Sequence, residues 1–358
     1  MQIAVIGSGM VGSLIASELG KENHVTVFDN SKDNLNKIES KKSNIEIKIL
    51  DVNNSLFETE IKNYQLAINC LPGFMGYSIL KKMIKLGISC TDISFMPEDC
   101  LDLSDLALKH NSIVIPDAGV APGLSNLIIG NIIVNNDIKE IRTMVGGLPK
   151  KKKSPWNYKA PFSPIDVIEE YTRPARMMID GKLVTKPALS EIDTITFEEC
   201  GALEAFNTDG LRSILLTMNH IPNMKEKTLR YPGHAELMQS IYDQGLFNED
   251  KINETVKSLF KDWALGKNEK EFTVLDINIY SASKNIHYHL YDEFNEDTQS
   301  SSMARTTGYT ATATINMIAN NLWNKKGVHP PEDIGLKREC INFLFKYLNS
   351  KGISIKKI

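Results

Sequence analysis

The stretch MQIAVIGSGMVGSLIASELGKENHVTVFDNS, residues 1–31, decides the fold class of this chain. Its first apolar run leads into three glycines in GxGxxG spacing, which are Gly7, Gly9 and Gly12. Apolar residues at helical spacing come next, and a second apolar run at 24–28 ends on Asp29. A strand, a glycine turn, a helix, a second strand and an acid in this order are typical of a dinucleotide-binding unit.

Each glycine of this turn has its own physical task. Gly7 permits the tight turn, Gly9 lets the backbone approach a pyrophosphate, and Gly12 lets the helix pack on the strand. The amino end of the helix adds amide donors and positive potential, which favour a bound phosphate. The turn therefore predicts a dinucleotide cofactor.

Asp29 predicts which dinucleotide binds. Its carboxylate would accept hydrogen bonds from both hydroxyls of the adenosine ribose and would repel a 2′-phosphate. The sequence thus predicts NAD rather than NADP. The alternative is that Asp29 only caps the turn Asp29-Asn30-Ser31 that follows it.

Four further apolar runs end in polar or glycine-containing loops, at 51–52, 69–73, 92–95 and 117–123. Helical stretches such as 78–86 separate them. This alternation predicts an α/β domain with a doubly wound parallel sheet, whose ligands bind outside the carboxyl ends of the strands. We assign residues 1–125 to this NAD-binding Rossmann domain.

The pattern changes after residue 130. Strand-like runs such as IKEIRTMVGGLP and EFTVLDINIYSA follow one another with few crossover helices, which predicts a mixed or antiparallel sheet in an inserted α+β domain. We assign residues 126–302 to this substrate domain. Residues 303–358 are expected to form C-terminal helices that return to the Rossmann domain.

Bulk composition excludes several classes of protein. A chain of 358 residues is long enough for two cores, since single cores stop growing near ~250–300 residues. The net charge of -3 gives no basic excess for a nucleic-acid partner. The five cysteines never form a CxxC pair, so neither a disulfide framework nor a metal site is expected. No apolar stretch approaches the ~18 residues that cross a membrane, and the expected compartment is the cytoplasm.

The chain resembles a known family over most of its length, from Gly7 to about Gly335. The motifs GSGMVG, DISFM, DAGVAPGLSN, VGGLP, SPIDVIEEYTRPA, EAFNTDG and TLRYPGHAE, in this order, are similar to those of the saccharopine dehydrogenase-like oxidoreductases. The likeness is greatest to the lysine 6-dehydrogenase branch. It implies a Rossmann domain, an inserted domain whose open sheet helps to form a homodimer, and NAD(P)-linked oxidation at a carbon that bears nitrogen.

The resemblance also implies site residues. Cofactor contacts would fall on Gly9, Met10, Val11, Asp29, Asp51, Val52, Cys70, Leu71, Ser94, Gly119, Val120 and Ala121, and on the turn that Pro72 makes. Substrate contacts would fall on Ser94, Phe95, Asn207, Thr208, Asp209 and residues 228–231. Saccharopine reductases carry an acid in GLDPG where this chain has Ala121 in GVAPG, which favours the lysine 6-dehydrogenase branch.

The expected chemistry requires a proton acceptor, because the amine nitrogen needs a free lone pair before its carbon can lose hydride. Asp117 is the first catalytic candidate, since it ends a strand beside the expected cofactor. Its alternative role is to cap the helix that begins near Leu124 or to hold the loop at Gly119. His234 is the second candidate, because imidazole titrates near neutral pH. Its alternative is a cap or a surface residue.

A free amino-acid carboxylate is best bound by the planar fork of a guanidinium group. Arg230, Arg212 and Arg173 are the candidates, in that order. Tyr231 begins the turn Tyr231-Pro232-Gly233, which would aim neighbouring side chains at one point. For each arginine the alternative is an ion pair within the protein surface.

The leading hypothesis from these residues is an NAD-dependent amino-acid dehydrogenase that deaminates the lysine side chain oxidatively and releases ammonia. A second hypothesis, also for an enzyme, is the reductive coupling of an amine with a carbonyl, as in saccharopine or carboxynorspermidine formation. A third reading, from another class, is a non-catalytic NAD sensor.

Overall fold

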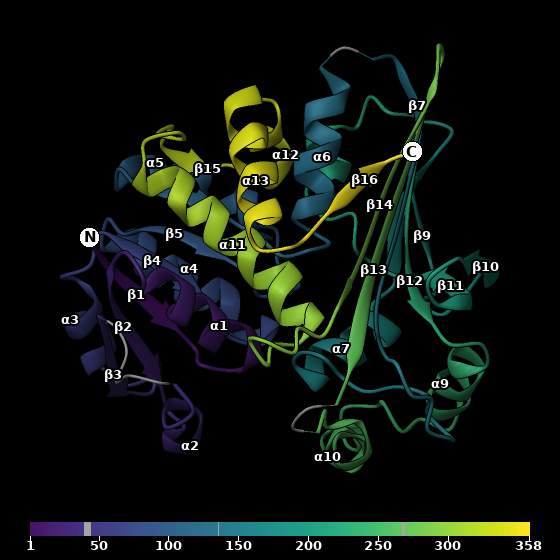
Figure 1. Ribbon diagram of the computed structural model, residues 1–358, viewed down its shortest axis with the longest axis horizontal. Coiled ribbons are helices and arrows are strands. Elements are labelled where there is room, and N and C mark those ends of the chain that lie inside the picture. Colours follow the sequence, from purple (N-terminus) through teal and green to yellow (C-terminus); the bar gives the residue numbers. More distant parts are fainter. Residues whose placement is uncertain (39–43, 135, 267–268) are drawn as a thin grey trace. The chain divides into compact units, whose positions relative to one another are not determined.

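The computed structural model describes residues 1–38, 44–134, 136–266 and 269–358 (Figure 1). The chain forms two compact units. Unit 1 contains Met1–Val134 and Ala304–Gly352, and unit 2 contains Asn135–Met303 and Ile353–Ile358. Within the described residues, no helix has both the length and the apolar character to cross a membrane.

Unit 1 is built on a sheet in which every strand pair is parallel, in the order β15-β6-β5-β4-β1-β2-β3. Its strands are β1 (Gln2–Ile6), β2 (His24–Asp29), β3 (Ile45–Ile49), β4 (Leu66–Asn69), β5 (Ser89–Asp92), β6 (Ile113–Ile115) and β15 (Gly327–Val328). The residues of β4, β5 and β6 are all buried, as expected when helices cover both faces of a parallel sheet. The predicted Rossmann architecture is confirmed.

In unit 1, helices follow each of the strands β1 to β6, and further helices lie in the C-terminal part of the chain. Together they are α1 (Met10–Leu19), α2 (Lys32–Leu35), α3 (Leu56–Ile61), α4 (Gly73–Lys85), η2 (Cys100–Leu103), α5 (Ser104–Lys109), α6 (Leu124–Ile133), α11 (Ser302–Ala319), α12 (Pro331–Gly335) and α13 (Arg338–Ser350). The core beneath them contains Phe28, Phe57, Leu80 and Met83, all fully buried.

Helix α6 belongs to unit 1, so the predicted boundary at residue 125 is wrong by one helix. A Cβ on Gly130 would lie 2.1 Å from Glu332 O, and a Cβ on Gly335 would lie 2.2 Å from Leu127 O. The glycines therefore let α6 and α12 touch backbone to backbone. Asn126 Nδ2 also donates to the buried Glu332 Oε2 at 3.0 Å.

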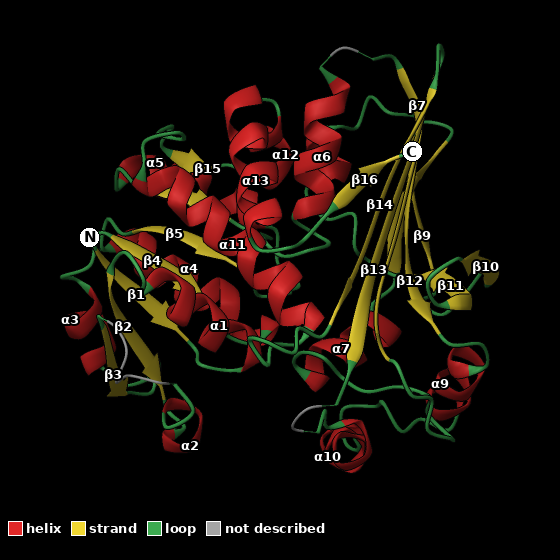
Figure 2. Cartoon of the chain, in the orientation of Figure 1, coloured by secondary structure: helices red, strands yellow, loops and turns green. Residues whose placement is uncertain are grey.

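Unit 2 is built on one mixed sheet, in which β10-β11-β12-β7-β13-β14-β16 are neighbours and β8 and β9 extend from β12. Its strands are β7 (Ile138–Pro149), β8 (Ala175–Ile179), β9 (Lys182–Lys186), β10 (Asp193–Phe197), β11 (Gly201–Asn207), β12 (Asn223–Arg230), β13 (Glu271–Ser281), β14 (Asn285–Glu293) and β16 (Ile355–Lys357). Figure 2 shows the long strands β7, β13 and β14 side by side. Because β12 pairs with β7 in parallel while the other pairs are antiparallel, the predicted mixed sheet is confirmed.

The helices of unit 2 are α7 (Pro164–Thr172), α8 (Ile214–Thr217), α9 (His234–Asp243) and α10 (Ile252–Trp263). Side chains from α7, α9 and α10 pack with the sheet residue Phe206 in one apolar cluster around Trp263. The last six residues were expected to join the Rossmann domain, and this expectation is wrong. Their strand β16 pairs with β14, which places 353–358 in unit 2.

Candidate functional site

The predicted cofactor residues lie along one edge of the sheet of unit 1. Because its strands are parallel, the loops that follow β1 to β6 all leave from the carboxyl edge. The glycine turn follows β1, Asp29 ends β2, and the later loops carry the other predicted contacts at 51–52, 70–72, 94 and 119–121. The strand order reverses between β1 and β4, because β2 and β3 lie on one side of β1 and β4 to β6 lie on the other. Such sheets bind nucleotides in the crevice at this point.

The glycine turn has the geometry that its spacing predicts. Gly7 has a φ of 94°, which favours glycine, and its N–H donates to Phe28 O at 2.8 Å. A Cβ on Gly12 would lie 2.1 Å from Gly7 O, so only glycine lets α1 start this close to β1. A Cβ on Gly9 would meet nothing within 4 Å, which leaves open space beside the first amides of α1. This cradle fits a pyrophosphate group.

Asp29 connects the end of β2 to the glycine turn. Its Oδ2 accepts from Ser8 N at 2.6 Å and from Ser8 Oγ at 2.7 Å, and its Oδ1 accepts from Ser31 N at 2.7 Å. The turn-capping alternative is therefore present in the structure. A carboxylate offers about four acceptor sites, so these three bonds leave about one site for a ribose hydroxyl. The ribose contact remains a prediction.

Three other predicted cofactor residues differ in what they can offer a ligand. Val52 is 5% exposed and packs in the core of unit 1, so only its backbone can face a ligand. Asp51 is exposed, and its Oδ1 accepts from Asn53 N at 2.8 Å. Burial, together with the charge of Asp92, raises the pKa of the Cys70 thiol, which keeps that thiol protonated at neutral pH.

A buried carboxylate that the sequence did not single out lies at the same edge. Asp92 is fully buried at the end of β5, where its Oδ2 accepts from Asn69 Nδ2 at 2.6 Å. Its Oδ1 accepts from Ser94 N at 2.7 Å and Ser94 Oγ at 2.6 Å. Burial is the main reason that the pKa of Asp92 is raised to about 7, and the charge of Asp117 adds to the effect. The predicted ligand Ser94 is thus fixed by Asp92.

Asp117 follows β6 and is 5% exposed, with a φ of 51°. The residue at the amino cap of α6 is Gly123, not Asp117, and its N–H points to Asn126 Oδ1 at 3.4 Å. The loop between them is closed tightly, because a Cβ on Gly123 would lie 2.0 Å from Gly119 O. The structure therefore brings Asp117 and Asp92 to the same part of the sheet edge.

The raised pKa of Asp92 predicts a pH-dependent stability. Between its ordinary value of 3.8 and about 7, the folded protein holds the Asp92 proton more tightly than the unfolded chain does. The Asp92 contribution to the free energy of unfolding therefore falls as pH rises through this window, by up to about 1.4 kcal/mol per pH unit, and is constant above it.

Chemical denaturation of the wild type and of Asp92→Asn from pH 5 to pH 8 measures this effect. We expect a shallower decline in the variant, because asparagine does not titrate. The exposed Asp105→Asn is the matched control and should follow the wild type. If the free energy of unfolding depended on pH equally in the wild type and in Asp92→Asn, the raised pKa of Asp92 would be contradicted.

In unit 2, the predicted substrate residue Thr208 belongs to a buried polar cluster. Its Oγ1 donates to Glu226 Oε2 at 2.6 Å and lies 2.9 Å from Thr228 Oγ1. Glu226 is 4% exposed, and burial raises its pKa to about 8. Sequence reasoning missed Glu226. The available signal was its place in β12 between Met224 and Thr228, where strand alternation directs all three side chains to one buried face.

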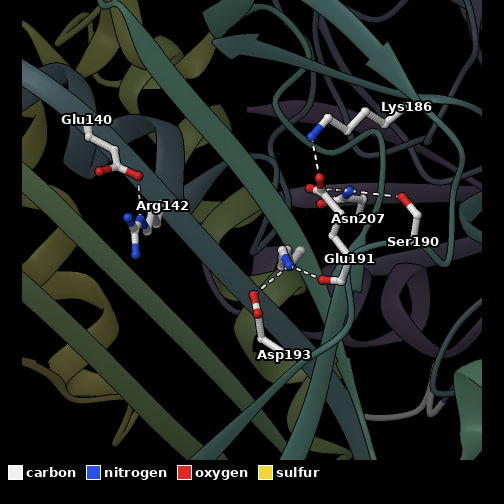
Figure 3. Close-up of polar contacts among 8 residues, drawn as sticks. Glu140, Arg142, Lys186, Ser190, Glu191, Asp193 and Asn207 are labelled. Atoms are coloured by element: carbon white, nitrogen blue, oxygen red, sulfur yellow. Dashed lines mark hydrogen bonds and ion pairs between the residues drawn. The ribbon is translucent and has the colours of Figure 1, made fainter. Parts of the chain in front are cut away.

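Asn207 and Asp209 lie next to Thr208 in sequence but bind other partners. Asn207 Nδ2 donates to Ser190 Oγ and to Glu191 Oε2, both at 3.0 Å, and Figure 3 shows these side chains with Lys186 beside Glu191. Both carboxylate oxygens of Asp209 accept from Arg176, at 2.9 and 2.8 Å. A contact of either residue with a substrate remains a prediction.

Arg230 is 3% exposed and already has an acidic partner inside unit 2. Its Nη2 pairs with Glu170 Oε2 at 2.7 Å and its Nε donates to Tyr171 Oη at 3.0 Å. Its guanidinium also lies 4.5 Å from the ring centroid of Tyr158. Arg230 therefore forms an ion pair, as in the alternative, but the pair lies inside unit 2 and not at the surface.

The structure contradicts the argument for a catalytic His234, which was that its imidazole titrates near neutral pH. This side chain is 2% exposed, with Nε2 2.9 Å from Tyr171 Oη and Nδ1 3.0 Å from Trp156 O. Burial first, and then the charge of Arg230, lowers the pKa of His234 to about 3. The imidazole is therefore neutral near pH 7, contrary to the premise that it titrates there.

The remaining predicted residues of unit 2 have contacts of their own. Tyr231 Oη donates to Pro149 O at 3.0 Å, and Lys152 Nζ lies 4.4 Å from the Tyr231 ring centroid. Arg212 is 6% exposed with a φ of 55°. Arg173 pairs with Glu169 at 2.7 Å. In unit 1, Phe95 is half-buried directly after Ser94.

Comparison with known families agrees with these two units. The model of the saccharopine dehydrogenase NADP binding domain matches residues 3–115, and that of the saccharopine dehydrogenase C-terminal domain matches residues 119–353. The chain belongs to the saccharopine dehydrogenase family. The model that matches residues 3–115 is described as NADP binding, which agrees with a dinucleotide-binding unit in this part of the chain.

The relatives that match are distant and longer. The mitochondrial alpha-aminoadipic semialdehyde synthase of Mus musculus is 24% identical over 70% of this chain and 29% of its own length. The saccharopine dehydrogenase (NADP(+), L-glutamate-forming) of Schizosaccharomyces pombe is 26% identical over 69% of this chain and 58% of its own. The chain therefore spans less than two thirds of the length of each of these two relatives.

A solved structure of the family shares the fold along the whole chain. The apo saccharopine dehydrogenase (L-Glu forming) of Saccharomyces cerevisiae aligns with a TM-score of 0.76 over 100% of this chain and 99% of that one, at 17% identity. The family domain is described as NADP-binding, whereas Asp29 predicts NAD. The choice between the two cofactors therefore rests on Asp29.

Proposed function

We propose that this family member is an NAD-dependent dehydrogenase that deaminates the side-chain amine of lysine oxidatively and releases ammonia. The observation that supports this most is the combination at one sheet edge in unit 1. An open cradle at Gly9 and the carboxylate of Asp29 suit NAD. Two acids lie at the same edge, Asp92 at the end of β5 and Asp117 after β6.

The residues present fit a dinucleotide. The backbone at Gly9 and the first amides of α1 would hold its pyrophosphate, and Asp29 would accept from the adenosine ribose. When bound, NAD supplies the hydride acceptor for oxidation of the carbon next to nitrogen.

The chain's own residues then have to manage protons and position the substrate. A lysine ammonium must lose a proton before its carbon is oxidised, so a carboxylate near the reacting nitrogen helps twice, by attracting the cation and by accepting its proton. We assign this task to Asp117. Asp92 acts as a positioning residue, because its two oxygens hold Asn69 and Ser94.

Reductive coupling of an amine with a carbonyl is the second candidate. The names of the relatives favour it, since the yeast protein is described as an L-glutamate-forming saccharopine dehydrogenase. Ala121 favours deamination, because the reductases that this chain resembles carry an acid at that position. The two reactions need different co-substrates, so one assay separates them.

The test is a set of absorbance assays for NADH, run with lysine, other diamines and polyamines, and saccharopine. We expect NAD to be reduced with lysine alone, with ammonia released in equal amount. Consumption of NADH only when an amine and a keto acid are both present would establish the coupling reaction instead. Tight NAD binding without turnover on any amine would overturn both and favour a sensor.

Asp29 gives a prediction about the cofactor. Asp29→Ser removes the carboxylate that repels a 2′-phosphate and binds the ribose, so we expect the ratio of NADP to NAD affinity to rise at least about tenfold. Titration of each cofactor into wild type and variant measures this ratio. Asp33→Ser, which removes an exposed acid from the start of α2, is the matched control. A wild type that prefers NADP would refute the argument.

A further inference from the structure

Three possible metal ligands lie together in unit 2, on two strands that carry none of the predicted site residues. Asp276 is in β13, and His287 and His289 are in β14. In the antiparallel pairing of these strands, Asp276 is opposite His289, and Asn278 is opposite His287. Because side chains alternate along a strand, His287 and His289 project from the same face of the sheet, on which Asp276 also lies.

The distances suit a small ion. His287 Nε2 is 2.6 Å and His289 Nδ1 is 3.2 Å from Asp276 Oδ2, and one ligand atom from each residue lies within 4.8 Å of the others. Bonds of about 2.0–2.2 Å in a tetrahedral zinc shell place neighbouring ligand atoms roughly 3.4 Å apart. Each donor therefore needs to move by less than ~1 Å to take its place around an ion.

The three ligands are contacted by further side chains of the kind that commonly orient the ligands of a metal site. His289 is 6% exposed, and its Nε2 makes no hydrogen bond within the described residues, although Glu199 Oε1 faces it at 3.4 Å. A ligating histidine commonly directs its second ring nitrogen to a carboxylate in this way. Asn278 Nδ2 donates to Oδ1 of Asp276. The Phe197 ring stacks on the His289 ring, with the two ring centroids 5.8 Å apart.

The cluster opens into a pocket of about 470 Å³ on this sheet face. Residues of β7, β10, β12, β13, β14 and β16 line it, and no lining residue comes from a helix. The half-buried His287 lies on the exposed side of the cluster, whereas Asp276 and His289 are buried. An ion held by the three side chains would thus keep an open position toward solvent.

We propose that Asp276, His287 and His289 bind a divalent transition-metal ion, and that zinc is the ion that fits them best. Two imidazoles and one carboxylate are a donor set that first-row transition ions accept, and harder ions such as Mg²⁺ prefer oxygen alone. The ion links β13 to β14 and carries exchangeable water on its pocket side. The cysteine pattern gave no indication of this site, because none of its ligands is a cysteine.

The same three side chains also satisfy one another through hydrogen bonds, so the test must separate a metal site from an internal polar cluster. The full-length protein is prepared without a histidine tag, stripped with a chelator, and titrated with Zn²⁺ by calorimetry. A parallel titration with Co²⁺ is followed by visible absorbance, which reports a tetrahedral nitrogen and oxygen shell directly.

We expect one equivalent of Zn²⁺ to bind at micromolar concentration or below, and the midpoint of thermal unfolding to rise with added metal. His289→Ala should abolish this binding, and His287→Gln, at a half-buried position that tolerates change, should weaken it at least tenfold. His220→Gln removes an exposed histidine elsewhere in unit 2 and should bind as the wild type does.

The proposal is overturned if stripped wild type takes up no zinc at 100 µM, a concentration far above ~1 µM affinity. Equal binding by wild type, His287→Gln and His289→Ala would also overturn it, since the metal would then sit elsewhere. Neither result bears on the dehydrogenase proposal, because none of these residues is in the nucleotide site of unit 1.

Discussion

Gly12→Ala is expected to abolish cofactor binding and to lower the free energy of unfolding by about 3 kcal/mol. The new Cβ would lie 2.1 Å from Gly7 O and 3.3 Å from Cys70 Cβ. The first of these atoms is backbone, which cannot rotate away as a side chain does. Either α1 moves off β1 or the glycine turn changes shape, and both displace the amides that face the cradle.

Gly9→Ala is the matched control, because its Cβ points into open space. We expect its unfolding curve to coincide with that of the wild type, while its NAD affinity falls at least tenfold, since the methyl group occupies the space left for the pyrophosphate. Denaturant titrations and cofactor titrations on both variants measure the two effects. Wild-type NAD affinity in Gly9→Ala would place the cofactor elsewhere.

Arg230→Met is expected to destabilise unit 2 by about 3 kcal/mol, because it leaves the carboxylate of Glu170 without its cation. Methionine fills a similar volume, so little of the loss comes from packing. The variant also removes the donor to Tyr171 Oη and the cation that lies 4.5 Å from the Tyr158 ring centroid. Chemical denaturation gives the change in the free energy of unfolding.

Two further variants identify the cause. The double change Arg230→Met with Glu170→Leu should recover most of the stability, because neither charge then remains unpaired. The exposed Arg338→Met should change stability by no more than about 0.5 kcal/mol. If Arg230→Met unfolds like the wild type but raises the KM for substrate, then Arg230 serves the substrate carboxylate and the ion-pair account fails.

Some residues of the candidate site were predictable because a pattern of neighbouring residues indicates them, and others were not. The glycine turn was predictable to the residue, because the spacing of Gly7, Gly9 and Gly12 is a pattern over a few positions of sequence. The backbone of Gly7 and the close contact of Gly12 require glycine, whereas a Cβ on Gly9 would point into open space. Asp92 was not, although it also ends a strand. Its significance lies in a raised pKa, which comes from burial and from Asp117 in the loop after a different strand.

The same reasoning explains the corrections in unit 2. Arg230 and His234 were chosen for the chemistry of their side chains, which is a property of the residue type. Their partners Glu170 and Tyr171 lie on α7, about sixty positions earlier in the chain. Only folding brings these groups together, and it turns a predicted carboxylate binder and a predicted base into parts of one buried network.

By itself, the sequence determined the parallel order of strands and helices in unit 1, the place of the glycine turn and the change to a mixed sheet, because periodicity and glycine spacing are encoded in neighbouring residues. The tertiary structure alone decided which charges are paired, which are buried, and that Asp276 meets two histidines across β13 and β14. Ion pairing, pKa and metal geometry depend on distances of a few ångströms between segments that the sequence keeps apart.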